Sequence, residues 1–119
     1  MEQNKLQVFY LDEALAFLRN LPIKVLEKIG FNISKIERGI LDNELFKKIG
    51  DTSIWEVRTV FNGNCYRLFA FWDTDSETLI IATHGIIKKT QKTPSKEIKK
   101  AEEIRKRYFK LKNNEIWQK

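Results

Sequence analysis

The sequence contains one cysteine and one histidine among its 119 residues, and no apolar run long enough to span a membrane. One cysteine forms no internal disulfide, and one Cys with one His is too small a set for a structural zinc site. The five glycines form no phosphate-binding loop, and no Ser, His and Asp arrangement is indicated. We therefore expect no metal and no cofactor. Met1 to Ala14 lack the features of a signal peptide, so we expect a cytoplasmic protein that does not act at a membrane.

Positive charge is concentrated in one segment of the chain. The net charge is +6, and residues 88–112 contain 11 basic and 3 acidic side chains. Such a segment indicates a polyanionic partner, with RNA or DNA favoured over a membrane surface because no broad apolar face accompanies it. The alternative is an ordinary lysine-rich helix with solvated charges. The length predicts one domain over residues 1–112 and a flexible tail at 113–119.

The strongest local signal is Asn62-Gly63, which stands between two aromatic and β-branched runs. This dipeptide favours a type I′ hairpin turn, because both central residues of that turn have positive φ. A two-residue loop fixes the pairing of the flanking strands, so Arg58 is predicted to lie opposite Arg67. Two like charges side by side destabilise a sheet unless an anion lies over them. The pair therefore predicts an anion-binding site.

A third strand is predicted after a second, turn-rich connection. A four-residue loop from Thr74 to Glu77 would pair Asp73 with Thr78 and place Arg67 opposite His84. In this register the only histidine joins the two arginines in one row across three strands. A shift of one residue would move His84 to the other face of the sheet, so its position depends on the loop length.

The remaining segments predict an α+β fold. Residues 11–21 and 22–40 have apolar residues at three- and four-residue steps, which indicates an N-terminal helical hairpin interrupted at a proline. The hairpin is expected to cover a small antiparallel sheet made of the three-stranded meander and a candidate edge strand from Lys5 to Tyr10. Residues 41–53 are expected to form a turn-rich connection. A C-terminal basic helix is predicted to follow Pro94.

Three stretches in the middle of the chain carry a family resemblance when they are taken in order. They are WEVR, NGNCYRLFAF and HGIIKKTQKTP, the last ahead of a basic helix. Together they resemble the RelE/ParE superfamily of bacterial toxins, in its HigB-like, phage-derived host-killing branch. The resemblance implies a RelE-like toxin fold. It also implies a type II toxin that cleaves mRNA on the ribosome without a metal and is neutralised by a helix-turn-helix antitoxin.

The resemblance, together with the position of the basic segment, identifies the candidate site residues. The candidate catalytic residues are Arg58, Arg67, His84 and Lys89. The candidate substrate-binding residues are Glu56, Lys88 and Lys92. In such a site the planar donor groups of the two arginines match the oxygens of a phosphate, where negative charge develops during cleavage.

Two of these residues are candidates for proton transfer. A histidine titrates at about 6.5, so His84 can serve as acid or base at neutral pH. Lys89 either acts as a base, because neighbouring cations disfavour its ammonium form, or stays charged and stabilises the transition state.

Other interpretations of the same residues stay open. Arg58 could pair with Glu56 or Asp51 and leave only Arg67 for a ligand. Glu56 would then orient an arginine or, alternatively, act as general base. A single histidine near a strand end is commonly just a hydrogen-bonded residue. The alternative functions are a ParE-like toxin that inhibits DNA gyrase without cleaving RNA, and an inactive homologue that only binds the antitoxin.

Overall fold

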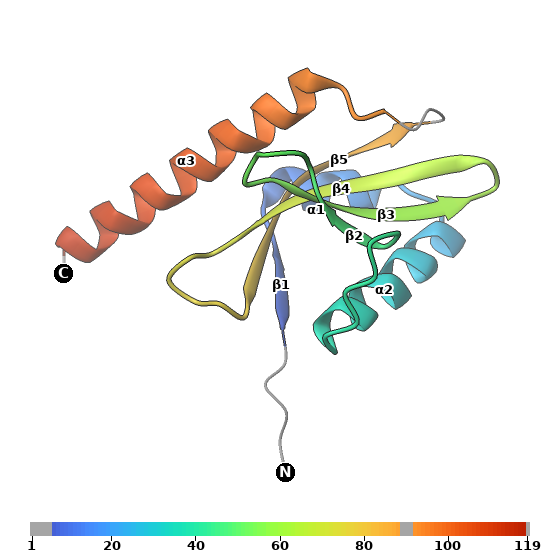
Figure 1. Ribbon diagram of the computed structural model, residues 1–119, viewed down its shortest axis with the longest axis horizontal. Coiled ribbons are helices and arrows are strands. Elements are labelled where there is room, and N and C mark those ends of the chain that lie inside the picture. The colour runs from blue at the N-terminus through green and yellow to red at the C-terminus, as the bar shows by residue number, and fades with distance from the viewer. Residues whose placement is uncertain (1–5, 89–91, 119) are drawn as a thin grey trace, which may run out of the picture.

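The chain forms one five-stranded sheet with helices on both faces (Figure 1). The structure is a computed structural model and describes residues 6–88 and 92–118. Its elements in chain order are β1 (Gln7–Tyr10), α1 (Asp12–Arg19), α2 (Ile23–Glu37), β2 (Phe46–Lys48), β3 (Trp55–Phe61), β4 (Asn64–Trp72), β5 (Leu79–Lys88) and α3 (Ser95–Gln118). The strand order is β1-β5-β4-β3-β2. No helix within the described residues is both long and apolar enough to cross a membrane.

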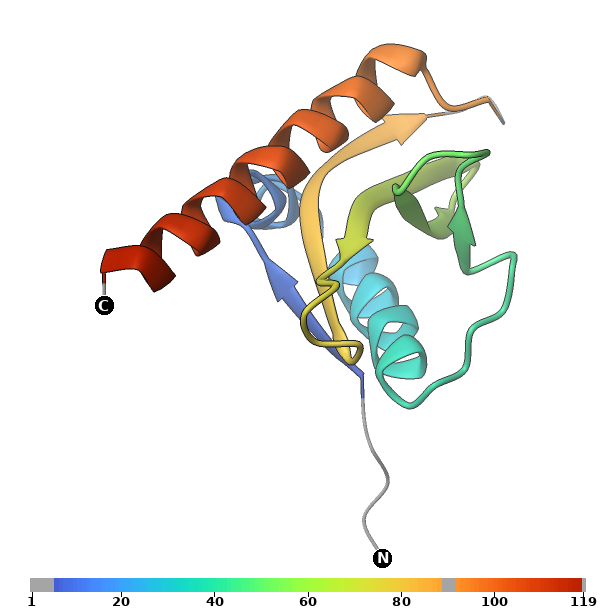
Figure 2. The ribbon, with the colours of Figure 1, turned by 60° about the vertical axis from the view of Figure 1, so that its left-hand side comes forward.

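The sheet separates two apolar cores, and Figure 2 shows α3 and α2 on opposite sides of it. On one side the buried stripe of α2 packs on β3 and β4; its residues are Val25, Ile29, Ile33 and Ile36. On the other side Ala101 of α3 packs on Phe69, Phe71 and Ile81. The α+β class and the N-terminal helical hairpin predicted from the sequence are therefore confirmed.

Helix α1 lies close against β5 because a glycine stands at the contact. A Cβ atom added at Gly85 would lie 2.3 Å from a ring carbon of Phe17, far inside van der Waals contact. The missing side chain therefore gives the Phe17 ring the space it occupies. This contact lets α1 approach β5 closely.

The first hairpin has the register that the sequence predicts. Arg58 is paired with Arg67, and the pairing continues from Phe61 with Asn64 to Trp55 with Ala70. Asn62 has φ 51° and Gly63 has φ 80°, the positive values that a type I′ turn needs.

The second pairing was predicted wrongly, and two local features explain the difference. The loop has one more residue than expected, because the N–H of Asp73 donates to the carbonyl of Leu79 instead of pairing with Thr78. Inside the turn the Asp73 side chain accepts a hydrogen bond from the N–H of Asp75. A bulge follows, with Thr83 as the extra residue between the pairs formed by Ala82 and His84. The two one-residue shifts together leave His84 on the predicted face but opposite Phe69, not Arg67.

The two edge strands also differ from the prediction in detail. The predicted edge strand at Lys5 to Tyr10 is present as β1, but it pairs in parallel with β5. The turn-rich connection at 41–53 contains β2, which pairs with β3 and which the sequence did not indicate. Phe46 is the only apolar residue of β2, so no alternating pattern marks the strand.

Helix α3 is fixed to the rest of the domain by polar contacts along its length. Lys100 forms an ion pair with Glu13 of α1 at 2.7 Å. Further along, Tyr108 donates a hydrogen bond to the buried carboxylate of Asp73 at 2.6 Å, and Lys112 contacts the same oxygen at 2.7 Å. The helix reaches Gln118. The domain limit at residue 112 and the flexibility of 113–119 stay predictions.

Candidate functional site

Two neighbouring rows of side chains cross the central strands on the sheet face that α3 covers. One row contains Arg58, Arg67 and Ile86, and the next contains Glu56, Phe69 and His84. Residues directly opposite each other in a sheet point to the same face, and so do residues two apart on one strand. The two arginines therefore share one face with Glu56 and His84, although His84 stands one row away from its predicted position.

Arg67 is completely buried and lies in a polar cluster with Glu56 and Thr93. Its Nη1 donates a hydrogen bond to Thr93 Oγ1 at 2.7 Å and lies 3.6 Å from Glu56 Oε1. The Thr93 hydroxyl in turn donates to Glu56 at 3.2 Å. Arg67 is 0% exposed and Glu56 4% exposed, so the two opposite charges compensate each other away from water. Within the described residues Glu56 thus pairs with Arg67, and the alternative of a pair with Arg58 is not observed.

His84 is also buried, and both of its ring nitrogens have partners. Nε2 lies 3.0 Å from a carboxylate oxygen of Glu97, and Nδ1 lies 2.9 Å from the Thr83 hydroxyl. Because a carboxylate only accepts, a neutral His84 carries its proton on Nε2 and accepts at Nδ1 from Thr83. The ring stacks on Phe69 with centroids 4.9 Å apart.

The titration of His84 is set by opposing effects. Burial lowers the pKa of His84 below its ordinary value of 6.5, and nearby Lys100 acts in the same direction. The hydrogen bond to Glu97 acts against both, but the net shift is downward. In this arrangement His84 is therefore a neutral group at pH 7 with its proton on Nε2. Nε2 becomes a proton acceptor only when Glu97 leaves and the ring proton moves to Nδ1.

Arg58 differs from Arg67 in its surroundings. It is half-buried, and its backbone N–H donates to the carbonyl of Leu45, the residue just before β2. Its side chain lines a hollow with Lys47 and Trp55 at the edge of the sheet. Among the described residues its buried Nε has no hydrogen-bond partner. Arg58 is therefore a more accessible cation than Arg67 for an incoming ligand.

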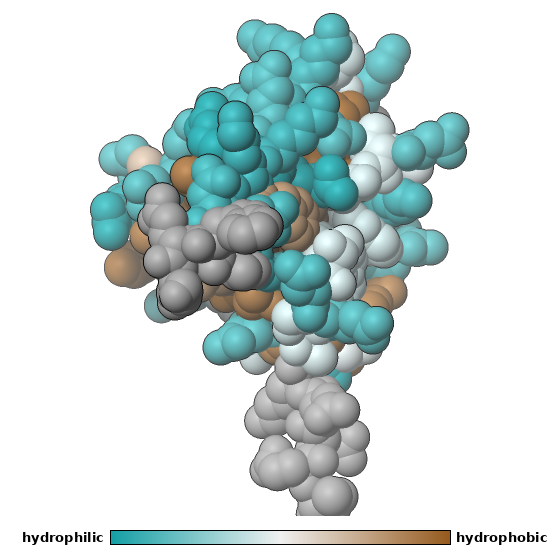
Figure 3. All heavy atoms as spheres, turned by 90° about the vertical axis from the view of Figure 1, so that its left-hand side faces the viewer, coloured by the Kyte–Doolittle hydropathy of each residue, from teal (hydrophilic) through white to brown (hydrophobic). Residues whose placement is uncertain are grey.

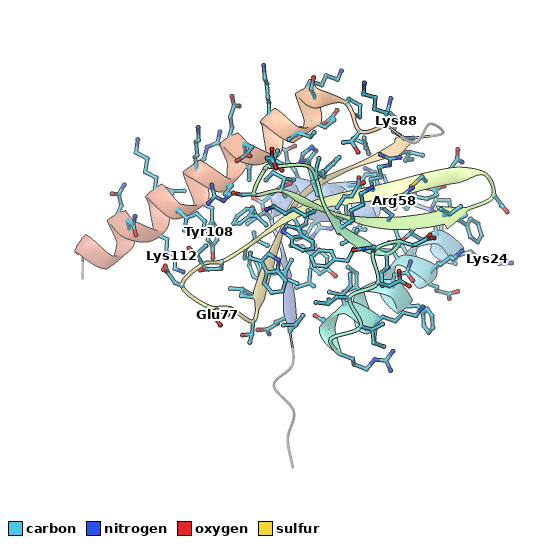
Figure 4. All side chains as sticks on the ribbon, viewed as in Figure 1. Lys24, Arg58, Glu77, Lys88, Tyr108 and Lys112 are labelled. Atoms are coloured by element: carbon cyan, nitrogen blue, oxygen red, sulfur yellow. The ribbon has the colours of Figure 1, made fainter. Side chains whose placement is uncertain are left out.

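The predicted lysines lie at the same end of the sheet, as far as the structure describes them. Figure 4 shows Lys88 at the end of β5, and the register places Lys88 opposite Cys65. Lys92 is exposed beside the start of α3. Lys89 lies outside the described residues, so its role stays a prediction.

Sequence reasoning missed two residues of this cluster, Thr93 and Glu97. Thr93 precedes a proline at a helix start, a position that hydroxyl residues commonly occupy as caps. Glu97 lies in the first turn of α3, where an acidic residue is common because it interacts favourably with the helix dipole, so its presence there did not indicate a site. The available signal was that Glu97 stands alone among the lysines of residues 88–101. Within residues 6–88 and 92–118 no group of three His, Cys, Asp or Glu side chains could hold a metal ion.

The fold is that of a RelE toxin chain. The structure superposes on the archaeal RelE–RelB complex from Pyrococcus horikoshii with a TM-score of 0.52 and 13% identity, covering 73% of this chain and 98% of that one. The toxin–antitoxin complex RelBE2 from Mycobacterium tuberculosis gives a TM-score of 0.46 and 19% identity, over 68% of this chain and 95% of that one. A comparison with curated proteins gives no significant match.

The sequence itself places the chain in a family. Residues 16–106 match the family model described as "Phage derived protein Gp49-like (DUF891)", and the chain belongs to this family. The family match agrees with the phage-derived character that the resemblance implies, and the superposition shows the RelE-like fold that it implies.

Proposed function

We propose that this chain is the toxin of a type II toxin–antitoxin system and a metal-free endoribonuclease that cleaves mRNA on the ribosome in the cytoplasm. The observation that carries this proposal is the direct pairing of Arg58 with Arg67, which puts two guanidinium groups on one face of the sheet. Like charges so placed favour an anion between or above them. Membership of the Gp49-like family and the RelE fold support the same conclusion.

In the proposed reaction the 2′ oxygen of one nucleotide attacks the adjacent phosphorus. The bond from phosphorus to the 5′ oxygen of the next nucleotide breaks, leaving a 2′,3′-cyclic phosphate and a free 5′ hydroxyl. A base takes the proton of the 2′ hydroxyl and an acid protonates the leaving oxygen. Arg58 and Arg67 would hold the phosphate oxygens, and His84 and Lys89 are the proposed proton-transfer groups, with Lys88 and Lys92 on the flanking backbone.

The contacts of Arg67 define what has to change when RNA binds. Nη1 of Arg67 donates a hydrogen bond to Thr93, just before α3, and Nε2 of His84 is hydrogen-bonded to Glu97, in the first turn of α3. The start of α3 therefore contacts both groups. In the proposed mechanism a phosphate oxygen replaces the Thr93 hydroxyl at Arg67, and Glu56 keeps the guanidinium in position. The start of α3 would move away from the sheet in that step.

The burial of these groups also favours a second candidate function. Arg67 and His84 are 0% and 3% exposed, and a buried ion pair beside a hydrogen-bonded histidine is a common structural arrangement. A ParE-like toxin that inhibits gyrase, or a homologue that only binds the antitoxin, would keep such a cluster for stability. For each of these functions the proposed partner is a helix-turn-helix antitoxin, as the resemblance to the HigB-like branch implies.

The experiment is expression of the chain with and without a candidate antitoxin, followed by primer extension on total RNA and a DNA supercoiling assay. We expect growth arrest and new RNA ends without a change in supercoiling. Arg58→Gln should remove the RNA ends, whereas the matched variant Lys24→Gln, at an exposed position of α2 on the other face of the sheet, should not. Arrest with relaxed DNA and intact RNA would favour the gyrase alternative, and no arrest would favour the inactive homologue.

Arg67 needs a paired design because of its burial. Replacing it alone leaves Glu56 as a buried unpaired charge, which costs about 3–5 kcal/mol of stability. The double variant Arg67→Gln, Glu56→Gln removes both charges and keeps hydrogen-bonding groups in place. Loss of RNA cleavage in the folded double variant would support the phosphate-binding role of Arg67, and full cleavage would exclude it.

A further inference from the structure

A second basic surface lies along the edge strand β2, beside the rows that contain Arg67 and His84. A hollow of 490 Å³ lies there, and its walls are Asn43, Glu44, Lys47, Lys48, Trp55 and Arg58. A second hollow of 290 Å³ adjoins it, because Lys48 and Trp55 line both, and it continues towards Trp72 and Arg105. The first hollow is within the range of about 300–1,000 Å³ that small ligands occupy in proteins.

Trp55 is the residue between the two hollows. Phe46 stacks against its ring with centroids 4.7 Å apart, and Trp72 meets it edge-on at 6.2 Å. These contacts hold the indole in a fixed orientation, while the side chain stays only partly buried and lines both hollows. An aromatic ring that is fixed by its neighbours and open to a hollow is a suitable platform for a flat ligand.

The charges around Trp55 are mainly positive. Lys47 and Lys48 are both exposed on β2, and Lys48 is paired directly with Trp55. Arg58 adds a third cation in the first hollow, where the one acid is Glu44. In the second hollow Asp51 opposes Lys48 and Arg105. Both hollows thus keep a positive balance next to an aromatic ring.

We propose that the β2 edge is a binding track for single-stranded RNA, in which Trp55 stacks a nucleobase and Lys47, Lys48 and Arg58 hold the neighbouring phosphates. Alternating cations and a stacking ring in an open groove are the features with which proteins bind single strands. Trp55 and its paired residue Lys48 point to the α2 face of the sheet, so the track passes around the β2 edge. Arg58 lines the same hollow but belongs to the row of Arg67, so it is the point at which a strand in the track reaches the proposed cleavage site. The inference rests on the proposed function and names the path of its substrate.

The test measures binding of a short, 2′-O-methylated RNA oligonucleotide, which cannot be cleaved, by fluorescence anisotropy at several salt concentrations. The variant Lys47→Gln, Lys48→Gln removes two cations of the track, and Arg19→Gln, Lys24→Gln removes two exposed cations of the N-terminal helices, outside the track and the basic segment. The slope of log K against log salt is negative, and each lost phosphate contact makes it less steep by about 0.7 for single strands. We expect the slope of the track variant to become less steep by about 1.4 and that of the control to stay within error. Equal slopes would overturn the proposal.

Trp55 is tested separately because stacking does not depend on salt. Trp55→Leu should weaken binding roughly 5- to 150-fold with an unchanged salt slope, and Trp55→Phe should retain most of the affinity. Photo-crosslinking of the unsubstituted chain to the same oligonucleotide carrying 4-thiouridine avoids any effect of substitution on folding. Crosslinks in the peptide containing Trp55 support the track, and crosslinks confined to other peptides overturn it.

The outcomes separate this inference from the proposed function. If the oligonucleotide binds as described but primer extension shows no cleavage of cellular RNA, the nuclease proposal fails and the track stands. If cellular RNA is cleaved while the Lys47, Lys48 and Trp55 variants bind and cleave like the unsubstituted chain, the track fails alone. Absence of any binding by the unsubstituted chain overturns the track directly.

Discussion

Nε2 of His84 lies 3.0 Å from a carboxylate oxygen of Glu97, so the first turn of α3 is joined to β5 at the centre of the candidate site. The two residues are close in sequence but belong to different layers of the fold. The contact therefore couples the position of α3 to the protonation of the only histidine in the chain.

The first prediction concerns the variant Glu97→Gln. Glu97 raises the pKa of His84 through its hydrogen bond and its charge, while burial lowers it. Removing the charge should therefore move the pKa of His84 further below 6.5. Because the chain has a single histidine, its imidazole signal in an NMR titration is unambiguous. Glu103→Gln, at an exposed position of the same helix, is the control and should leave the titration unchanged. A rise in the pKa would contradict the role given to Glu97.

The second prediction is a pH dependence of stability that originates from His84. The pKa of His84 is lower in the folded chain than its ordinary value of 6.5, so the unfolded chain binds the proton first as the pH falls. The free energy of unfolding should therefore decrease from about pH 6.5 downwards until the folded pKa is passed.

Denaturant unfolding of the unsubstituted chain and of His84→Gln isolates this contribution, since carboxylates also titrate towards low pH. The difference in unfolding free energy between the two proteins should be constant above about pH 7 and shrink as the pH falls. A difference that stays constant down to pH 5 would show that the folded pKa of His84 is not depressed.

The first hairpin shows what local sequence can determine. A type I′ turn requires positive φ at both central residues, and Asn62-Gly63 is a dipeptide that adopts it readily. These two residues therefore determine both the turn and the pairing of Arg58 with Arg67. Register fixed by a turn also fixes which side chains share a face. The cationic pair was therefore predictable before any tertiary information.

The second hairpin and the depth of the site were not predictable in this way. The bulge at Thr83 depends on pairing across β4 and β5, and no turn residue marks it. Similarly, the buried Arg67 donates a hydrogen bond to Thr93, which is distant in sequence and stands just before α3. The sequence indicated a basic helix but contained no signal for the face of the sheet on which it packs. Contacts between distant segments decided both features.

The third prediction concerns the attachment of α3 at Asp73. Burial acts to raise the pKa of Asp73, but hydrogen bonds from Lys112, Tyr108 and the N–H of Asp75 outweigh it and hold the pKa below its ordinary value. Tyr108→Phe removes one donor from a carboxylate that is 1% exposed. Hydrogen bonds to charged groups contribute about 1.5–3 kcal/mol, and we expect a loss of that size in the free energy of unfolding.

Urea unfolding measures this loss, and hydrogen exchange tests where it arises. Amide protection should fall along α3 in Tyr108→Phe and stay unchanged in the first hairpin. Lys110→Met, which alters an exposed side chain of the same helix, should change neither quantity. Equal stability of Tyr108→Phe and the unsubstituted chain would mean that the bond to Asp73 contributes nothing.

The fourth prediction compares one substitution at two glycines and expects opposite signs. Gly63 has φ +80°, where an L side chain is strained, so Gly63→Ala should lower the free energy of unfolding by about 1–2 kcal/mol. Gly30 lies in α2, is exposed, and has no atom within 4 Å of an added Cβ. Gly30→Ala should therefore raise the free energy of unfolding by about 1 kcal/mol, because alanine is the better helix former.

Denaturant unfolding of both variants under one set of conditions checks the signs. The comparison bears on the candidate site, since the turn at Gly63 holds Arg58 opposite Arg67. A strained turn should loosen that pairing, so RNA cleavage by Gly63→Ala should fall more than its loss of stability explains, whereas Gly30→Ala should cleave like the unsubstituted chain. If Gly63→Ala is as stable and as active as Gly30→Ala, the turn does not control the spacing of the two arginines.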